Sequence, residues 1–298
     1  MPSAASFASN PTIKMLLIGH SKSRKTSSLS SLLKANYRVL VADFDNNLDF
    51  LIQDLAKNAP SLLKNLLYVP LRDSTRIDRN SNVIPVGTPH AFEDFQMLLD
   101  EGMEPNPAWA KASKEDRPKI PRYIPLINPD TEEPIGPVPN LGTSWIFVID
   151  SLWAAGRAAF LQHGKMQPSN DPRKTYYGAG QMLLSFLDAI KDPAFTPHVI
   201  VISHMTPVEL ANGASKFFPS SIGKANAVDV PKLFPRLLVA ERRGQGKNAK
   251  YVISTTSTDD IDAGSALPTG AIAETLPQET ALAEYFVACG ATPSKGAK

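Results

Sequence analysis

Short, uninterrupted apolar runs recur along the chain and are separated by longer segments of mixed polarity. Apolar runs of about four to eight residues predict strands that are buried on both faces, as in a parallel sheet. Such runs cover about residues 12–18, 37–42, 67–69, 145–150, 198–203, 236–241 and 250–255. Segments with helical periodicity lie between them, at about residues 26–34, 47–57, 153–163, 181–191 and 278–288. This alternation predicts an α/β fold whose central sheet is mostly parallel, is flanked by helices and ends in an antiparallel pair of strands.

The Pro-rich segment of residues 70–144 interrupts this alternation. Proline lacks the N–H donor that a central strand needs, so the segment is predicted to be an insertion outside the central sheet. Within it, residues 90–100 predict an amphipathic helix, and NPDTEEPIG is predicted to join two short strands within residues 123–138. The insertion could be a lid or an assembly surface, or be partly disordered. The predicted parts of the chain are a flexible leader (residues 1–11), a core (12–258) and a C-terminal tail with one helix (259–298).

The first apolar run leads into GHSKSRKT, residues 19–26, which opens a predicted helix. Strand, loop, Lys25-Thr26 and helix in this order are typical of a phosphate-binding loop, in which backbone N–H groups surround a polyphosphate. Lys25 is then predicted to reach the β and γ phosphates and Thr26 to bind Mg²⁺. Arg24 stands where such loops have a second glycine, and the alternative interpretation is an ordinary basic turn. The predicted nucleotide-binding residues are Gly19, His20, Ser21, Lys22, Ser23, Arg24, Lys25 and Thr26.

Three polar residues follow other predicted strands: Asp45 in DFDNNLD, Asp150 in FVIDS and His204 in VISH. The carboxyl ends of parallel strands form the edge at which open α/β sheets bind ligands. Asp150 is predicted to hold Mg²⁺ together with Thr26. His204 is predicted to sense the γ-phosphate or position the attacking water; the alternative is a histidine that is hydrogen-bonded locally.

Two polar segments, residues 164–178 and 205–231, are predicted to be long loops in which basic residues stand beside aromatic ones. Such loops suit single-stranded nucleic acid, because bases stack on rings while cations contact phosphates. An ordinary surface loop with packed tyrosines is the alternative for the first segment. The candidate DNA-binding residues are Arg173, Lys174, Tyr176, Tyr177, Lys216, Phe217, Phe218 and Lys224.

Composition limits the function less than these motifs do. The chain has 298 residues, of which 43% are hydrophobic, and its formal net charge of +2 is too small to indicate a nucleic-acid partner by itself. The single cysteine, Cys289, excludes an internal disulfide and suits a reducing cytoplasm. No secretory signal sequence is evident, and the longest apolar runs are too short to span a membrane.

Taken together, GHSKSRKT, DFDNNLD, FVIDS and VISH resemble the ATPase core of the RecA family, in particular phage-encoded members that act in single-strand annealing and recombination. The resemblance covers about residues 12–57 and 145–255. It implies that Asp45 activates the attacking water, that Lys25 and His204 act on the γ-phosphate, and that the two long loops grip single-stranded DNA. It also implies a homo-oligomeric ring or filament, a single-strand-binding protein as a possible further partner, and the cytoplasm of a bacterial host. A basic residue acts across the subunit interface in the family, and the candidates are Arg242, Arg243, Lys247 and Lys250.

The family usually has Glu where this chain has Asp45, and the shorter side chain predicts slow hydrolysis. The sequence therefore predicts an ATP- and Mg²⁺-binding, ATP-hydrolysing protein of single-stranded DNA recombination or replication. One alternative is a nucleotide-binding scaffold or switch with little turnover in a phage assembly. Another alternative is a small-molecule kinase, but the sequence has no recognisable basic lid motif.

Overall fold

The computed structural model describes residues 12–77, 79, 83–210, 213–258 and 260–291. The predicted leader, residues 1–11, lies outside these ranges. No helix among the described residues is long and apolar enough to cross a bilayer. The predicted division into leader, core and tail stays a prediction.

A nine-stranded sheet forms the centre of the molecule, with the strand order β13-β12-β11-β1-β9-β8-β2-β3 and β10 paired to the outer half of β9. The six strands from β11 to β3 run parallel, whereas β10, β12 and β13 pair antiparallel. This confirms the predicted fold class, including the antiparallel strands after the parallel ones, and it is the architecture that the RecA-core resemblance implies. The strands are β1 (Lys14–Gly19), β2 (Arg38–Asp43), β3 (Leu66–Pro70), β8 (Trp145–Asp150), β9 (His198–Glu209), β10 (Ser215–Pro219), β11 (Arg236–Arg243), β12 (Lys250–Ser254) and β13 (Thr275–Pro277).

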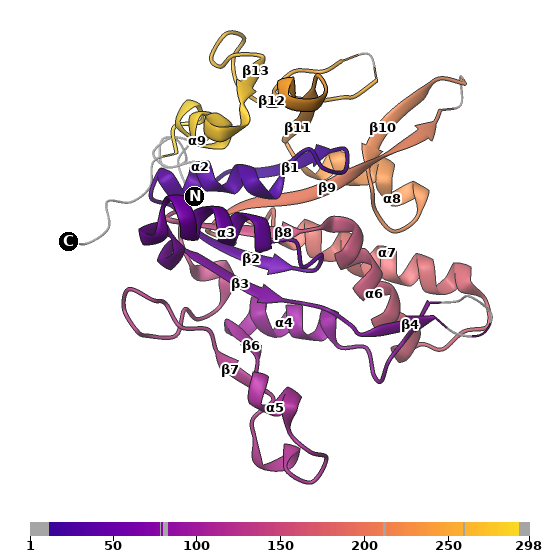
Figure 1. Ribbon diagram of the computed structural model, residues 1–298. Helices are drawn as coiled ribbons and strands as arrows, with labels where there is room; N and C mark the ends of the chain where they lie inside the picture. The colour runs from indigo at the N-terminus through magenta and orange to yellow at the C-terminus, as the bar shows by residue number, and fades with distance from the viewer. Residues whose placement is uncertain (1–11, 78, 80–82, 211–212, 259, 292–298) are drawn as a thin grey trace, which may run out of the picture.

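Helices cover both faces of the sheet (Figure 1). Side chains alternate along each strand, so Leu16 and Ile18 enter one apolar core while Met15 and Leu17 enter the other. The first core is closed by α4 (Ala91–Glu101), α6 (Leu152–Met166) and α7 (Pro172–Ala189), and the second by α2 (Leu29–Lys34), α3 (Asp49–Asn58) and α9 (Gln278–Ala288). The remaining α-helices among the described residues are α5 (Pro107–Lys111) and α8 (Lys224–Asp229).

The prediction that residues 164–178 form a long loop is wrong. Helix α7 begins at Pro172, and the Asp171 carboxylate accepts a hydrogen bond from the backbone N–H of Arg173. Asp followed by Pro is a common start of a helix, because the Asp side chain caps a free N–H and Pro has no N–H to satisfy. Arg173, Lys174, Tyr176 and Tyr177 therefore lie on the first turns of a helix.

The prediction of a long loop at residues 205–231 is also wrong. Strand β9 continues past the predicted end at Ser203, reaches Glu209 and folds back onto β10 as an antiparallel hairpin. The hairpin places Phe217 opposite Pro207 and Phe218 opposite Thr206. The pairing of β9 with β10 satisfies backbone N–H and C=O groups that would bond to water if these residues formed a loop.

The strands of residues 70–144 form two separate two-stranded sheets, so none joins the central sheet among the residues described there. One sheet pairs β4 (Thr75–Ile77) with β5 (Val83–Pro85), and the other pairs β6 (Met103–Pro105) with β7 (Tyr123–Pro125). Strand β7 thus pairs with an earlier segment, which corrects the predicted pairing across NPDTEEPIG. The turn itself forms, with a bridge between Ile127 and Pro134.

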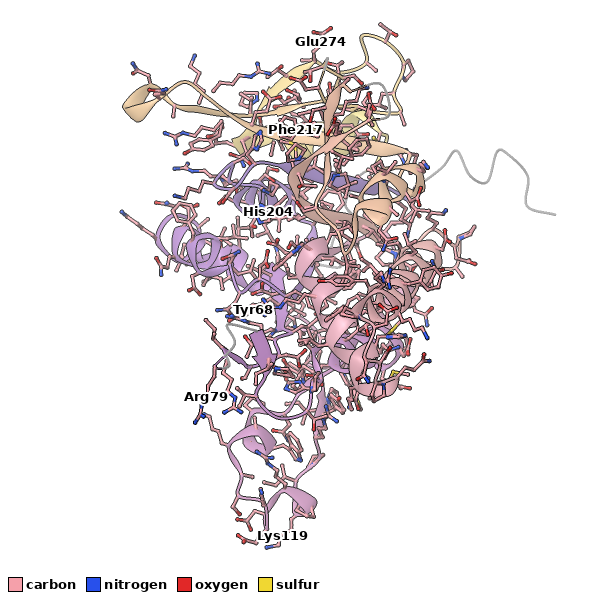
Figure 2. The ribbon with its side chains drawn as sticks, turned by 90° about the vertical axis from the view of Figure 1, so that its right-hand side faces the viewer. Tyr68, Arg79, Lys119, His204, Phe217 and Glu274 are labelled. Carbon is pink, nitrogen blue, oxygen red and sulfur yellow. The ribbon has the colours of Figure 1, made fainter. Side chains whose placement is uncertain are left out.

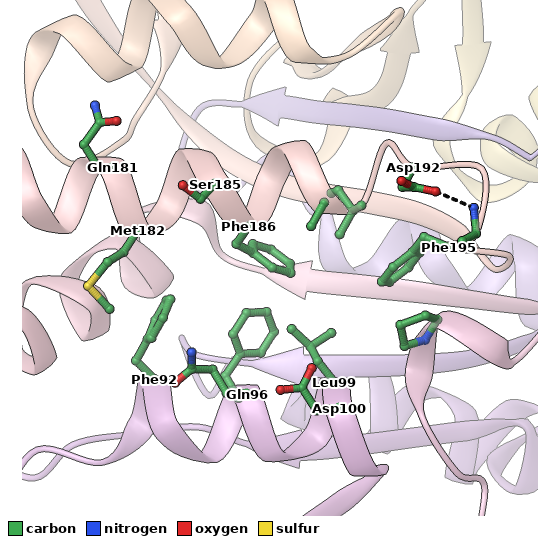
Figure 3. A pocket seen from close by; sticks show the side chains of 15 residues that line it. Phe92, Gln96, Leu99, Asp100, Gln181, Met182, Ser185, Phe186, Asp192 and Phe195 are labelled. Carbon is green, nitrogen blue, oxygen red and sulfur yellow. Dashed lines mark hydrogen bonds between the residues drawn. The ribbon is translucent and has the colours of Figure 1, made fainter.

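Helix α4 attaches this segment to the rest of the molecule. The Phe95 ring is 1% exposed and contacts the rings of Phe44, Phe147 and Phe186, which belong to β2's end, β8 and α7. Between α4 and α7 lies an apolar cavity of about 710 Å³, shown in Figure 3. The segment is therefore a structural part of one apolar core and not only an appendage.

We expect Phe95→Ala to destabilise the fold by about 3–5 kcal/mol, because truncation of a fully buried ring leaves a void that the packed core cannot close. The matched control is Phe50→Ala, in which the same truncation removes a ring that is 56% exposed. Denaturant unfolding of both variants measures the difference in free energy. Equal costs at the two positions would contradict the packing role assigned to α4.

Candidate functional site

Four neighbouring strands bring the predicted site residues to one edge of the sheet. Strand β1 ends at Gly19, β8 ends at Asp150, β2 leads into Asp45, and β9 carries His204 beside Gly19. Figure 2 views this edge, with His204 near its middle and Phe217 on the neighbouring hairpin. The sequence prediction that these strand tips converge is confirmed, because parallel strands all end at the same edge.

The loop after β1 is tightly packed against β11. A Cβ atom on Gly19 would meet the Ala240 carbonyl oxygen and lie 2.7 Å from Ser23 Oγ, so only glycine fits there. Lys25 is buried, and its Nζ donates to the carbonyl oxygens of Gly19 and His20 at 2.9 and 3.0 Å. The loop therefore curls around the Lys25 ammonium group.

Several polar groups of the loop have no partner in the described part of the chain. These are the buried Ser23 hydroxyl and the backbone N–H groups of Lys22, Arg24 and Lys25. Unpaired N–H groups that precede a helix form a site for an anion. The loop thus has the donors that a phosphate would accept.

Arg24 adopts the left-handed conformation, with φ of 60°, that a glycine at this position would adopt. That conformation costs a non-glycine residue about 1–2 kcal/mol. The side chain points out of the loop, with its guanidinium 4.1 Å from the centroid of Tyr251 and 5.6 Å from that of Phe50. Gln278 of α9 donates to the carbonyl oxygens of Ser23 and Arg24. The departure from glycine therefore keeps the loop's backbone shape.

Thr26 and Asp150 are joined by a hydrogen bond, in which Thr26 Oγ1 donates to Asp150 Oδ2 at 2.6 Å. The Asp150 side chain is buried, and this burial raises its pKa to about 7, with nearby Asp45 and Asp43 adding to the shift. Burial lowers the pKa of Lys25 to about 8, against the opposing effect of Asp150 and Asp45. Three carboxylates and one ammonium group therefore share this edge.

Asp45 is held in place by the strand beside it. The backbone N–H groups of Phe44 and Asp45 donate to the Asp150 carbonyl oxygen at 2.6 and 3.1 Å, and the Asn46 N–H donates to Asp43 Oδ1 at 2.7 Å. The turn after β2 is thereby fixed to the end of β8. It directs Asp45 toward His204, whose Nε2 is 3.9 Å from Asp45 Oδ2.

His204 lies between Lys25 and Asp45. Its Nδ1 is 3.4 Å from Lys25 Nζ, and since an ammonium group can only donate, Nδ1 is the acceptor and Nε2 carries the proton. Burial and the Lys25 charge lower the pKa of His204, so the imidazole is neutral at pH 7. The 3.9 Å contact with Asp45 is consequently not an ion pair at that pH.

The oxygen donors of Thr26 and Asp150 suit Mg²⁺, which prefers hard oxygen ligands and is usually held by one or two protein groups plus substrate phosphates. The described residues contain no group of three or more His, Cys, Asp or Glu side chains that could hold a metal ion. A metal at this edge would therefore share its coordination with a phosphate. The three carboxyl groups at this edge outnumber its one ammonium group, so the local charge favours binding of a metal cation.

The predicted DNA-binding residues fall into two separate groups. On α7, Tyr176 and Tyr177 are 49% and 72% exposed, although the Tyr176 ring also contacts Phe160 at 4.6 Å. On the β9–β10 hairpin, Lys216 pairs with Asp262 at 2.7 Å, and the Phe217 ring lies 5.1 Å from His20 of the loop after β1. The remaining candidates are Arg173, paired with Asp171, Lys174 on α7, Phe218 on β10, and Lys224, the first residue of α8.

The four candidates for a residue that acts across an interface lie on or near the turn between β11 and β12. Arg243 is held by Glu241 at 2.9 Å and by Ser254 at 3.1 Å, whereas Arg242 and Lys250 are exposed. Lys247 lies in the turn itself. Because β11 pairs with β1, this turn is near the loop that follows β1 in the same chain.

Sequence reasoning missed Gln278 and Tyr251, which support the loop at Arg24. Gln278 lies more than two hundred residues from Arg24 in the sequence, and no motif marks it. Only the packing of α9 beside the loop brings the two together. Tyr251 lies on the second strand of the predicted antiparallel pair, but only the pairing of β11 with β1 brings this strand beside the loop.

No protein-family model matches the sequence, and no curated protein sequence is similar to it. A KaiC-like protein of Pyrococcus horikoshii is similar in structure, with 9% identity and a TM-score of 0.34 over 82% of this chain and 79% of that one. The flagellar accessory protein FlaH of Methanocaldococcus jannaschii has 10% identity and a TM-score of 0.37 over 91% of this chain and 89% of its own. The RadB recombinase has 12% identity and a TM-score of 0.39 over 85% of both chains. These likenesses concern the general fold alone and lend no support to a phage origin.

We expect Asp150→Asn to stabilise the ligand-free protein at pH 7, because the variant buries no carboxylate. The pKa of Asp150 is raised from 3.8 to about 7 by folding, so rising pH ionises the unfolded chain first and lowers wild-type stability across this window. The advantage of the variant should thus be absent below about pH 4, grow up to about pH 7 and then stay constant.

Denaturant unfolding in a chelating buffer from pH 4 to 8 measures this advantage. Asp188→Asn is the control, since that carboxylate is 61% exposed and pairs only with Lys191. A constant difference between wild type and Asp150→Asn across the range would show that Asp150 is ionised in the folded protein throughout.

Proposed function

We propose that this protein binds ATP with Mg²⁺ and hydrolyses it. The observation that supports this most is the contact between Thr26 and Asp150 beside the buried Lys25. A hydroxyl and an ammonium group from the segment after β1 converge there with a carboxylate from the end of β8, at a loop with unpaired N–H groups. A basic surface turn would need none of these contacts.

In this proposal the loop N–H groups and Lys25 bind the phosphates. Lys25 exchanges a bond to the Gly19 or His20 carbonyl for one to a phosphate oxygen, which is a stronger acceptor because it is charged. Thr26 and Asp150 hold Mg²⁺, which neutralises charge on the phosphates. The raised pKa of Asp150 falls when a cation is bound beside it, so binding favours the ionised carboxylate.

Hydrolysis then needs a group that takes a proton from water. Asp45 is partly exposed, with a side chain 16% accessible, and lies at the rim of the same edge. Its carboxylate accepts the proton while the water oxygen bonds to the γ-phosphorus and the bond to the ADP oxygen breaks. Neutral His204, fixed by Lys25, can donate a hydrogen bond from Nε2 to the water or to a γ-phosphate oxygen.

We further propose that single-stranded DNA is the partner and that several copies of the chain bind it together. The contact between Phe217 and His20 supports a link between DNA and nucleotide, because it couples the β9–β10 hairpin to the phosphate loop. A net charge of +2 gives one copy little attraction for DNA, which supports binding by an oligomer. A cytoplasmic location and a single-strand-binding partner remain predictions.

Lys25→Ala should abolish ATP binding, since it removes the one ammonium group that the loop encloses among the residues described. Isothermal titration calorimetry on folded variant protein measures the affinity. Lys34→Ala, which removes an exposed ammonium group from α2, is the control and should bind as wild type does. Unchanged affinity in Lys25→Ala would rule out the phosphate-loop assignment.

Asp45→Asn should leave ATP affinity nearly unchanged while turnover falls by ~10²- to 10⁴-fold, the usual loss when a general base is removed. Phosphate release at saturating ATP measures turnover, with and without an oligonucleotide. A wild-type protein that binds ATP but hydrolyses none under any DNA or salt condition would instead be a nucleotide-dependent scaffold or switch.

Phe217→Ala should weaken DNA binding at every salt concentration, because stacking on a ring is insensitive to salt, whereas Arg173→Ala should flatten the salt dependence. Fluorescence anisotropy of a labelled single strand at two salt levels, with and without a non-hydrolysable ATP analogue, measures both effects. If wild type binds no oligonucleotide in any of these conditions, the partner is not single-stranded DNA.

A further inference from the structure

A second, smaller cavity lies beside Asp45 on the side away from the phosphate loop. Its volume is about 180 Å³, and it is enclosed by the ends of β2 and β3, the start of α4 and the first turns of α6. Asp45 lines it, but neither Lys25 nor any other residue of the loop does. Its other polar lining residues are Arg72, Asp73, Thr75, Trp153 and Arg157.

Neither of the cavity's two arginines forms a salt bridge within the described chain, although the charge of Arg72 opposes the rise in the pKa of nearby Asp43. Arg157 lies on α6 with its guanidinium 5.9 Å from the Trp153 ring centroid, and Arg72 follows β3. A guanidinium group has five N–H donors and can bind several acceptor oxygens at once. Two guanidinium groups at one small cavity therefore suit an anion that accepts several hydrogen bonds, such as a phosphate.

Two further residues that line the cavity, Trp153 and Asp73, suit the base and the hydroxyl or amino groups of a nucleotide. Trp153 is 45% exposed although it is a large aromatic residue at the rim of a cavity, and the ring surface that the Arg157 guanidinium leaves exposed can stack against a planar base. Asp73 caps α4 through Oδ1, which accepts from the N–H groups of His90 and Ala91 at 2.6 and 3.1 Å. Its Oδ2 is buried and has no donor among the described residues, so it can accept from a hydroxyl or amino group.

We propose that this cavity is a second site, distinct from the phosphate loop, which binds one nucleotide unit with its phosphate at Arg72 and Arg157 and its base on Trp153. The proposal rests on the proposed function in one respect, since Asp45 lines both sites and so places the second ligand beside the γ-phosphate. The unit is part of a single strand or a free mononucleotide, which share this chemistry. A strand bound here would lie next to the group that activates water.

The test uses the full chain, with the phosphate loop saturated by a non-hydrolysable ATP analogue and Mg²⁺. Thymidine monophosphate or an oligothymidylate is then added, and tryptophan fluorescence is recorded. Trp153 is the exposed one of the three tryptophans, because Trp145 is 5% exposed and Trp109 is half-buried. Stacking should therefore quench the wild-type signal, and Trp153→Phe should abolish most of the change.

Affinity is measured separately by anisotropy of a labelled oligothymidylate or by equilibrium dialysis of the mononucleotide. Trp153→Ala should weaken binding by about 5- to 150-fold, the loss that corresponds to one stacked base. Arg157→Ala should weaken it comparably, and Arg157→Lys should restore only part, since lysine lacks the planar fork. The control is Lys119→Ala, which removes a positive charge at the far end of the insertion (Figure 2) and should bind as wild type does.

Quenching by the oligothymidylate alone would identify a strand as the ligand, and quenching by the mononucleotide alone would identify a free nucleotide. No quenching by either ligand, or equal binding by wild type and the Trp153 and Arg157 variants, would overturn the proposal. Affinity for the ATP analogue is measured in each variant and should not change. If the wild-type protein does not bind the ATP analogue, this result instead contradicts the proposed function, whatever is observed at the second site.

Discussion

The hydrogen bond from Thr26 to Asp150 joins two strands that are not neighbours. β1 and β8 are separated by β9, so the side chains meet above the point where His204 continues the middle strand. Every other contact of the candidate site depends on this alignment of three strand ends. Asp45 is fixed by the Asp150 carbonyl group, His204 by Lys25, and Lys25 by the loop that leads to Thr26.

Burial of the Asp150 carboxylate lowers the stability of the ligand-free protein, so a contribution to stability does not explain why an aspartate is present there. An aspartate at 3% exposure with a pKa of about 7 is half protonated near neutrality, and its neighbours Asp43 and Asp45 add negative charge. An asparagine could accept the same bond from Thr26 without that cost. A buried carboxylate that has lost its solvation is expected where the group contacts a cation once a ligand is bound.

Strands were predicted well because a strand buried on both faces is apolar throughout, which a sequence shows directly. The predicted ends of these strands also implied that Lys25, Asp45 and Asp150 lie at one edge of the sheet, and in the structure they do. The two predicted loops failed because their local signals were weaker than their pairing: Asp171-Pro172 starts a helix, and residues 205–209 extend a strand only because β10 pairs with them. The roles of Gln278, Tyr251 and the Trp153 cavity depend on contacts between distant segments, which one sequence does not reveal.

Arg24 shows how such contacts decide the meaning of an unusual residue. From the sequence, an arginine in place of glycine implies a distorted loop. In the structure the left-handed backbone costs about 1–2 kcal/mol, and the contact between the Arg24 guanidinium and the Tyr251 ring offsets about 0.5–1 kcal/mol of this cost. The Gln278 bonds to the Ser23 and Arg24 carbonyl oxygens hold the loop in the same backbone shape that glycine would give it. Arg24 then connects the loop after β1 to Tyr251 on β12.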